Sequence, residues 1–449
     1  MPDVAPPAHF SPEQRCDFAS ACEHVQADEL RRLTAEVVSI PSPVGAEAEL
    51  AAYFTGLLAG GGLAAEYQEF GPGRGNAIAR RAGDGSGPAL LLFAPIDMHI
   101  AGNAEEDGPG LQLDGRADLR PQAVIDGDFV IGLGAENPKG HAVCVAAAAI
   151  ALARAGVALR GDLLVGLAGG GMPANAAPPR FAAGHGSGCS YLLEHGSAPD
   201  FAIIAKPGGA VAYEEVGLCW FKLTVHGQFN YAGIPPRAEV RNAVVDAAAL
   251  VRHLQAWFPA YTARNTSGLV APNGTVSAIA GGWPEKPAFV PDRCAVYVDL
   301  RISPRTTPAD AERQLGEALD AIRIAEPGLT FDCELIAAVP GTTTPPENWI
   351  VRSSVAAWEA TYGRAHALRT GTSGATDANT LRGHGIPTAR IGMAALGAGA
   401  PFAGTFSMGV VSVRAMLRLT HALIAIAIDT CTRTRREVEL ADGKEALPS

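Results

Sequence analysis

Three short and almost uninterrupted apolar segments most constrain the fold of this chain. Residues 89–94, 162–167 and 201–205 consist mostly of Leu, Ile, Val, Ala and Phe, and segments of helical periodicity separate them. A strand that is apolar on both sides must be buried on both faces, as happens when helices cover a sheet. We therefore predict an α/β protein whose main domain holds a mostly parallel, helix-covered sheet.

The segment between residues 215 and 338 has a different pattern. It reads as strand, helix, strand, strand, helix, strand, with the helices over 242–258 and 307–325. Pro308 suits the first turn of the second helix, because a proline there removes no helical hydrogen bond. This order is typical of a ferredoxin-like α+β module.

We predict that this module is a separate domain inserted into the main one. The predicted division is a tail or an extra helix over 1–28, a main domain over 29–214 and 339–436, the inserted domain over 215–338, and a second tail over 437–449. A chain of 449 residues is long enough for two cores of this kind.

The composition excludes several classes of partner. A net charge of −11 argues against binding to nucleic acid or to an anionic membrane. None of the eight cysteines forms a Cys-x-x-Cys pair, which favours free thiols in a reducing compartment. The first residues lack the basic and apolar regions of a secretory signal, so we expect a cytoplasmic protein. The apolar run 142–159 contains Arg154 and Gly156, and it fits a helix packed on a sheet better than a membrane span.

An ordered set of short motifs runs along the chain. They are Asn76–Ala79 (NAIA), Ala89–Asp97 (ALLLFAPID), Gly132–Gly140 (GLGAENPKG), Gly161–Ala168 (GDLLVGLA), Gly217–Gly227 (GLCWFKLTVHG), Val290–Arg301 (VPDRCAVYVDLR), Ser373–Asp377 (SGATD) and Gly385–Pro387 (GIP). Over residues 30–434 this set resembles the aminoacylase, desuccinylase and glutamate carboxypeptidase family of co-catalytic zinc hydrolases. The resemblance implies cleavage of carbon–nitrogen bonds. It also implies that the inserted domain over 215–338 is a lid, through which the chain dimerises.

The resemblance also implies two zinc ions, but the positions of their ligands hold other residues. These are Pro95, Asn137, Met172, Lys206 and either Thr405 or Phe406. Proline offers no lone pair, and an amide lacks the charge of a bridging carboxylate. The family's general base would fall at Gly171, and its lid histidine at Tyr231. We therefore predict no metal ligand and no cofactor.

The candidate catalytic residues are Lys206, Asp97, Tyr231 and Asn137. An ammonium at Lys206 can replace a metal cation, pair with Asp97, and bind a carboxylate or polarise an oxygen. A desolvated lysine can also act as a base or nucleophile. Tyr231 can donate a hydrogen bond to an oxyanion. The alternative is a salt bridge between Lys206 and Asp97 that only fills the former metal site.

The candidate substrate-binding residues are Arg301, Asn242, Ser373, Gly374, Thr376 and His99. The resemblance implies contacts with a carboxylate or amide at most of them, and an arginine fork suits a carboxylate. Arg301 could instead form a structural salt bridge with Asp299 or Asp292. Asp377 is expected to cap the following helix, and His141 to lie on a helix surface.

Three functions remain open from the sequence. The first is an enzyme that acts on a carbon–nitrogen bond of a small carboxylated molecule without the zinc pair. The second is a catalytically inactive binding or scaffold protein. The third is a hydrolase with a rearranged single-metal site built from Asp97, His99 and Glu136, with His185 as an optional further ligand. In each case we expect a homodimer that contacts neither nucleic acid nor membrane.

Overall fold

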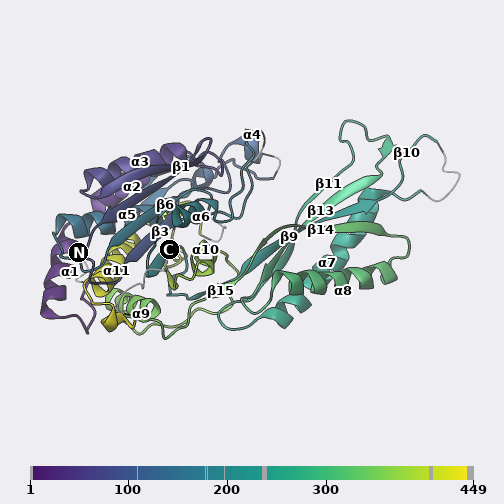
Figure 1. The fold of residues 1–449 in the computed structure, drawn as a ribbon. Coiled ribbons are helices and arrows are strands. Elements are labelled where there is room, and N and C mark those ends of the chain that lie inside the picture. Colours follow the sequence, from purple (N-terminus) through teal and green to yellow (C-terminus); the bar gives the residue numbers. More distant parts are fainter. Residues whose placement is uncertain are drawn as a thin grey trace. The chain divides into compact units, whose positions relative to one another are not determined.

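The computed structural model describes residues 4–108, 110–176, 178, 180–196, 198–234, 240–403 and 408–441. The chain divides into two compact units (Figure 1). Unit 1 takes in Met1–Tyr213, Thr344–Arg369 and Thr376–Ser449, and unit 2 takes in Glu214–Thr343 and Thr370–Ala375.

Unit 1 is built on a sheet with the strand order β1-β2-β6-β3-β7-β16 among the described residues. The strands are β1 (Ala64–Gly71), β2 (Arg74–Arg81), β6 (Leu163–Ala168), β3 (Leu90–Pro95), β7 (Phe201–Ala205) and β16 (Thr388–Ile391). From β6 to β16 the pairs are parallel, whereas β1 and β2 pair antiparallel at one edge. The mostly parallel sheet predicted from the apolar runs is confirmed.

Helices cover both faces of this sheet, which explains why β3 is apolar on both sides. On one face Leu90 and Leu92 join the large core beneath the helices, and on the other Leu91 and Phe93 pack against α6 and α10. The helices of unit 1 are α1 (Pro12–Glu23), α2 (Ala27–Val38), α3 (Ala48–Gly60), α4 (Ala104–Asp107), α5 (Lys139–Arg154), α6 (Ser187–Glu194), α9 (Trp349–Tyr362), α10 (Ala378–Gly383) and α11 (Val413–Cys431), with short 3₁₀ turns at Ala117–Leu119 and Arg436–Val438. The run that suggested a membrane span is α5, which is buried beside β3.

The N-terminal segment is part of the core, and of the two alternatives for 1–28, a tail or an extra helix, the structure has the helix α1. Phe10 and Phe18 are buried against unit 1, and Ser11 forms a capping box with Gln14 at the start of α1. His9 contacts the buried Asp429 of α11 at 2.9 Å. The apolar and capping residues of this segment give it a fixed place. At the other end, Val438 is also buried, and residues 442–449 lie outside the described residues.

A small sheet lies beside the main one in unit 1. It consists of β17 (Val410–Ser412), β5 (Phe129–Ile131) and β4 (Val124–Asp126), paired antiparallel. This pairing ties the start of α11 to the segment just before Asn137.

Unit 2 has the predicted ferredoxin-like arrangement. Its sheet has the order β11-β13-β9-β14, and every pair is antiparallel. The elements are β9 (Gly217–His226), α7 (Ala243–Asn265), β11 (Gly274–Gly281), β13 (Arg293–Ile302), α8 (Pro308–Ala325) and β14 (Thr330–Val339), with short pairs β10 (Asn230–Tyr231) with β12 (Phe289–Val290) and β8 (Glu214–Glu215) with β15 (Thr342–Thr343). Both long helices pack on this sheet around a separate core.

Helix α7 runs seven residues beyond the predicted end at Phe258. Proline usually ends a helix, but Pro259 lies inside α7. Tertiary contacts hold the last turns instead: Tyr261 Oη donates to the carbonyl of Arg301 at 2.7 Å, and Asn265 Nδ2 donates to Gln314 Oε1 at 2.9 Å.

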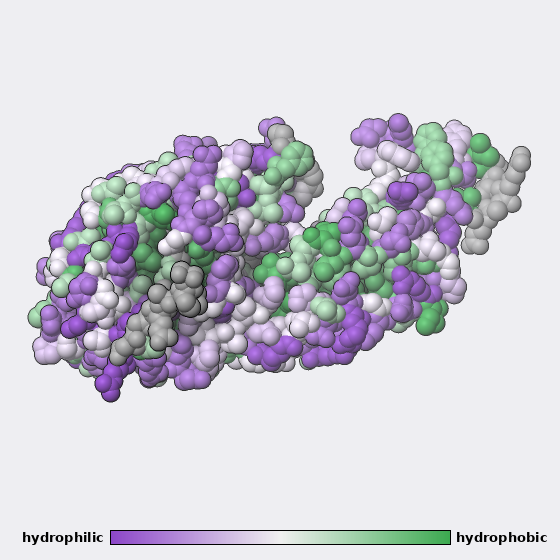
Figure 2. Space-filling view, viewed as in Figure 1, coloured by the Kyte–Doolittle hydropathy of each residue, from purple (hydrophilic) through white to green (hydrophobic). Residues whose placement is uncertain are grey.

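Unit 2 exposes several large apolar side chains around β10 and β12. Phe229 stacks on Phe289 with ring centroids 5.5 Å apart, and Tyr231 and Trp283 contact the same pair. Phe229 is 59% exposed and Tyr231 44% exposed. Figure 2 shows hydrophobic residues in the region of β10. Within the described part of the chain, no helix is both long and apolar enough to span a membrane.

Candidate functional site

The candidate site of unit 1 lies where parallel strands of its sheet end. Asp97 follows β3, the glycine run Gly169–Gly171 follows β6, and Lys206 follows β7. The carboxyl ends of neighbouring parallel strands meet at one edge of a sheet, where α/β proteins bind ligands. The fold therefore brings together two of the predicted catalytic residues, Asp97 and Lys206.

Asp97 is fully buried, and the backbone holds its carboxylate. Oδ1 accepts from the N–H of Gly171 at 2.7 Å, and Oδ2 accepts from the N–H of Met172 at 2.9 Å. Burial and the nearby charge of Glu47 raise the pKa of Asp97 to about 7. Both oxygens of Asp97 accept from backbone donors, and the pairing of Lys206 with Asp97 stays a prediction.

Lys206 is 5% exposed and lies beside Met172 and Asp377. Its Nζ is 3.7 Å from Met172 Sδ, and its charge opposes the rise that burial causes in the pKa of Asp377. The same charge, together with burial, lowers the pKa of His99. Lys206 therefore places a positive charge close to Met172, Asp377 and His99.

The glycine run is explained by a buried ion pair and a carboxylate that pack against it. Glu47 is fully buried, and its carboxylate accepts from Arg74 Nη2 at 3.1 Å and from Arg74 Nε at 3.3 Å. A Cβ on Gly169 would lie 2.8 Å from Glu47 Cγ, and a Cβ on Gly171 would lie 2.5 Å from Asp377 Oδ2. Neither Glu47 nor Arg74 was identified from the sequence. An unusual glycine triplet at a strand end was the available signal.

The segment around Asn137 contributes further buried polar groups. Asn137 Nδ2 donates to Met408 Sδ at 3.3 Å, and its Oδ1 has no hydrogen-bond partner among the described residues. Burial raises the pKa of Glu136 to about 7. Lys139, which follows Pro138, donates to the carbonyl of Ile40 at 2.6 Å and so has a structural role.

His141 is buried, although it was expected on a helix surface. Its Nδ1 lies 2.6 Å from the carbonyl of Glu136, and its Nε2 accepts from the N–H of Met393 at 3.3 Å. Burial lowers the pKa of His141 to about 3, so the ring is neutral. It ties α5 to the segment after β16, a contact that no local pattern of the sequence reveals.

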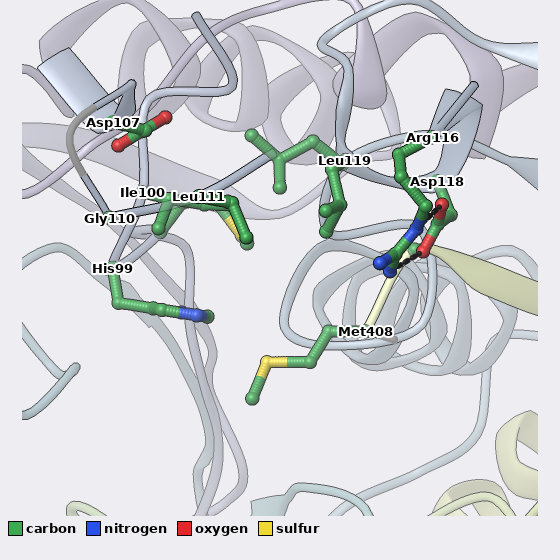
Figure 3. A pocket seen from close by; sticks show the side chains of 12 residues that line it. His99, Ile100, Asp107, Gly110, Leu111, Arg116, Asp118, Leu119 and Met408 are labelled. Carbon is green, nitrogen blue, oxygen red and sulfur yellow. Dashed lines mark hydrogen bonds and ion pairs between the residues drawn. The ribbon is translucent and has the colours of Figure 1, made fainter. Parts of the chain in front are cut away.

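A cavity of about 500 Å³ adjoins these residues in unit 1. His99 and Met408 point into it, and Arg116 is held in a paired contact with Asp118 at 2.7 and 2.8 Å (Figure 3). Its other lining residues are Met98, Ile100, Asp107, Gly110, Leu111, Leu119, Leu133 and Gly409. Since Met408 contacts Asn137 and His99 responds to the charge of Lys206, the cavity lies beside the polar groups described above.

Most of the predicted substrate-binding residues belong to unit 2, where local contacts occupy them. Arg301 forms a paired salt bridge with Asp299 at 2.8 and 2.9 Å, which favours its structural alternative. Asn242 caps α7 by accepting from the N–H of Val244 at 3.0 Å. Ser373 Oγ accepts from the N–H of Asn273 at 3.2 Å.

The remaining predicted positions are spread over both units. Tyr231 is an exposed residue of β10, and a Cβ on Gly374 would meet no neighbouring atom within 4 Å. Thr376, in unit 1, accepts from the N–H of Ala378 at 3.2 Å. Thr405 and Phe406, the predicted site of the last ligand position, lie outside the described residues.

We expected the side chain of Asp377 to cap α10, but it does not. Its backbone is helical (φ −60°, ψ −8°) instead of extended, and its side chain makes no capping hydrogen bond. The carboxylate is buried next to Gly171 and Gly186. The packing of α10 against the strand ends, which the sequence does not specify, gives Asp377 this position.

Three comparisons place the chain among known proteins. Residues 213–325 match the peptidase dimerisation domain of the M20 type. The chain is 29% identical over 360 residues to a succinyl-diaminopimelate desuccinylase from a Methylobacterium species, covering 77% of this chain and 84% of that protein. Its fold resembles the di-peptidase Dug1p from Saccharomyces cerevisiae (TM-score 0.70, 12% identity, 92% of this chain and 98% of that one). It also resembles the M20 family metallo-carboxypeptidase Sso-CP2 from Sulfolobus solfataricus (TM-score 0.64, 15% identity, 90% and 100%).

These findings confirm the resemblance to the aminoacylase, desuccinylase and carboxypeptidase family and the α/β fold with its separate ferredoxin-like unit. The relatives named above are peptidases and a desuccinylase, which are hydrolases of carbon–nitrogen bonds. The relation to such hydrolases that we predicted is therefore confirmed.

The prediction that the chain takes no cofactor is contradicted. One protein of the same fold is an M20 family metallo-carboxypeptidase, which by its name uses a metal. The donor chemistry of unit 1 does not match a zinc pair, because Pro95, Met172 and Lys206 supply no carboxylate or imidazole. Among the described residues, no three His, Cys, Asp or Glu side chains are grouped to hold a metal ion, so Asp97, His99, Glu136 and His185 do not form the rearranged site either. We assign no metal ligand among these residues.

Proposed function

We propose that this chain, a relative of the M20 peptidases and desuccinylases, hydrolyses an amide carbon–nitrogen bond of a small carboxylated substrate in the cleft of unit 1. The observation that carries the proposal is the buried cation of Lys206 at the carboxyl end of β7, whose charge acts on His99 in the wall of a cavity of about 500 Å³. Burial of a charge is costly, so a buried ammonium at a ligand-binding edge indicates a function for that charge.

Lys206 can supply the positive charge that amide hydrolysis needs. As water attacks the amide, negative charge develops on the carbonyl oxygen, and a fixed cation stabilises it strongly in a site from which water is excluded. Asn137 can orient the same group. Its Oδ1, without a hydrogen-bond partner among the described residues, can accept a substrate N–H.

The cavity suits the apolar part of the substrate. Met98, Leu111 and Leu119 line it, and Asp118 holds the guanidinium of Arg116 in place. His99 can hydrogen-bond as a neutral ring at pH 7, because burial and Lys206 lower its pKa. One relative is a desuccinylase, so N-acyl amino acids are the first substrates to consider.

The contacts within unit 2 bear on the roles predicted for its residues. Arg301 and Asn242 are engaged within unit 2, whereas the phenol of Tyr231 is exposed. The role predicted for Tyr231 stays a prediction. Ser373, Gly374 and Thr376 remain candidates for backbone or hydroxyl contacts with substrate.

Turnover of a substrate panel tests the proposed function. Purified protein should hydrolyse at least one member of a set of N-acyl amino acids, N-carbamoyl amino acids and dipeptides, measured as release of the free amine. Each assay is run on protein as isolated, after chelator treatment, and with added Zn²⁺, Co²⁺ or Mn²⁺, so that a metal requirement appears as a difference between the arms.

The second candidate function is binding without turnover. It is favoured by the residues at Pro95 and Met172, which lack the donors of the zinc hydrolases. Binding of panel members by calorimetry, with no amine released in any metal arm, would establish it and reject the hydrolase.

We further propose that the chain forms a homodimer through unit 2, in which the exposed aromatic residues around β10 and β12 take part. The match to a peptidase dimerisation domain supports this. Phe229→Asp with Phe289→Asp should convert a dimer to a monomer in light scattering, because two charges cannot be buried cheaply in an apolar contact. Ile324→Asp, at an exposed position of α8, is the matched control and should stay dimeric. A monomeric wild-type protein would refute the dimer, and a dimeric double variant would exclude this surface.

A further inference from the structure

Asp377 is an unusual carboxylate for a residue with no assigned role. It is 2% exposed, and neither of its side-chain oxygens accepts a hydrogen bond from another described residue, although a contact with its own backbone N–H favours the charged form and so lowers its pKa. Buried carboxylates are nearly always hydrogen-bonded, and leaving one without donors costs stability. The presence of such a group despite its cost in stability indicates a functional role for it.

The carboxylate of Asp377 lies beside the end of β6. Its Oδ2 is 2.5 Å from the point where a Cβ on Gly171 would be, and its Oδ1 is 3.5 Å from the corresponding point on Gly186. A side chain at position 171 would therefore have to enter the space that Asp377 fills. Position 171 is where the resemblance places a carboxylate that this chain lacks.

Asp97 differs from Asp377 in how its oxygens are used. Each oxygen of Asp97 already accepts from a backbone N–H, at 2.7 and 2.9 Å. Those hydrogen bonds fix the turn after Gly169–Gly171 and leave Asp97 poorly placed to take a proton from water. Asp97 is therefore better described as a positioning residue for the turn on which Asp377 packs.

We propose that Asp377 is the group that transfers protons in this cleft, and that α10 supplies the carboxylate that residue 171 does not. The inference rests on the proposed hydrolysis. The carboxylate takes one proton from water as the water oxygen bonds to the carbonyl carbon. It returns that proton to the amide nitrogen as the carbon–nitrogen bond breaks, so the carboxylate is regenerated and the products are an acid and an amine.

The charges around Asp377 agree with this role. Lys206 faces it from the end of β7, Asp97 from the end of β3, and the thiol of Cys189 from α6. Burial raises the pKa of Asp377 to about 6, and Lys206 limits the rise. A base with a pKa just below neutral is mostly ionised at pH 7 and still accepts a proton readily.

Asp377→Asn tests the proposal on the best substrate of the panel. We expect kcat to fall by about 100-fold with a KM within a few-fold of wild type, as for loss of a general base. Wild-type kcat should decline below about pH 6, where Asp377 becomes protonated, and the variant should lack this decline. The matched control is Asp28→Asn, a carboxylate on α2 whose side chain is 93% exposed, which should leave both the rate and the pH profile unchanged.

The outcomes separate this inference from the proposed function. If wild type is active and Asp377→Asn keeps its rate or its acid limb, Asp377 is not the proton carrier, although the hydrolase stands. If kcat falls only together with the melting temperature, the residue is structural and the inference is overturned. If wild type turns over no substrate, both proposals fail.

Discussion

Replacing Lys206 by Met is expected to reduce kcat/KM about 1000-fold, the upper range for loss of one preorganised electrostatic contact. Methionine has a similar length and can fill the same apolar surroundings next to Met172, so the loss should reflect the missing charge. In the same variant, Asp377 loses the cation that favours its ionised form, and its pKa should rise further. Steady-state kinetics on the best panel substrate, recorded across a range of pH, measure the loss in kcat/KM and the rise in the pKa of Asp377. A thermal melt checks that the variant is folded.

The matched control for this variant is Lys286→Met, at an exposed lysine of unit 2. It removes the same charge from the chain and should leave kcat/KM unchanged. A Lys206→Met protein with wild-type kinetics would show that the buried ammonium only fills space. That result would favour the salt-bridge alternative drawn from the sequence.

The largest effect on stability is expected at Arg74. Arg74→Met leaves Glu47 fully buried without its cation and removes hydrogen bonds of 3.1 and 3.3 Å. Breaking one side of a buried ion pair costs about 3–5 kcal/mol, because a charge then remains unpaired in the interior. The free energy of unfolding, measured in urea and followed by a probe in unit 1, should fall by that amount.

Two further variants test the reason for this loss. Adding Glu47→Leu to Arg74→Met removes the unpaired charge and should recover most of the stability, since replacing both partners by apolar groups is often nearly neutral. Arg313→Met breaks the exposed pair with Glu317 on α8 and should give no resolvable change. Equal losses in Arg74→Met and the double variant would attribute the effect to packing instead of charge.

The fold was largely predictable because the pattern of apolar residues in each strand indicates which of its faces are buried. Leu90–Phe93 is apolar on both faces, and the structure shows two different helical layers that explain it. Lid elements were also readable, because Pro308 marks a helix start by local chemistry. The boundary at Phe258 failed because contacts of Tyr261 and Asn265, made far along the chain, outweighed the local signal of Pro259.

The site was less predictable, since its groups meet only through packing. Lys206 and Asp97 were found because the family resemblance marks their positions after two recognisable apolar strands. Asp377 looked like a helix cap, and nothing in its neighbourhood of the sequence shows that it packs against Gly171, some two hundred positions earlier. The donors that hold the carboxylate of Asp97 are the N–H groups of Gly171 and Met172, and the sequence around Asp97 does not reveal this contact either.

The most direct test of a buried ammonium acting in this cleft is chemical rescue of Lys206→Ala. We expect that this variant loses activity on the best panel substrate and recovers part of it when ethylammonium is added. The recovered rate should saturate with the concentration of the protonated amine. Activity that survives the substitution, or that returns with a divalent metal and not with the amine, would contradict the role of Lys206.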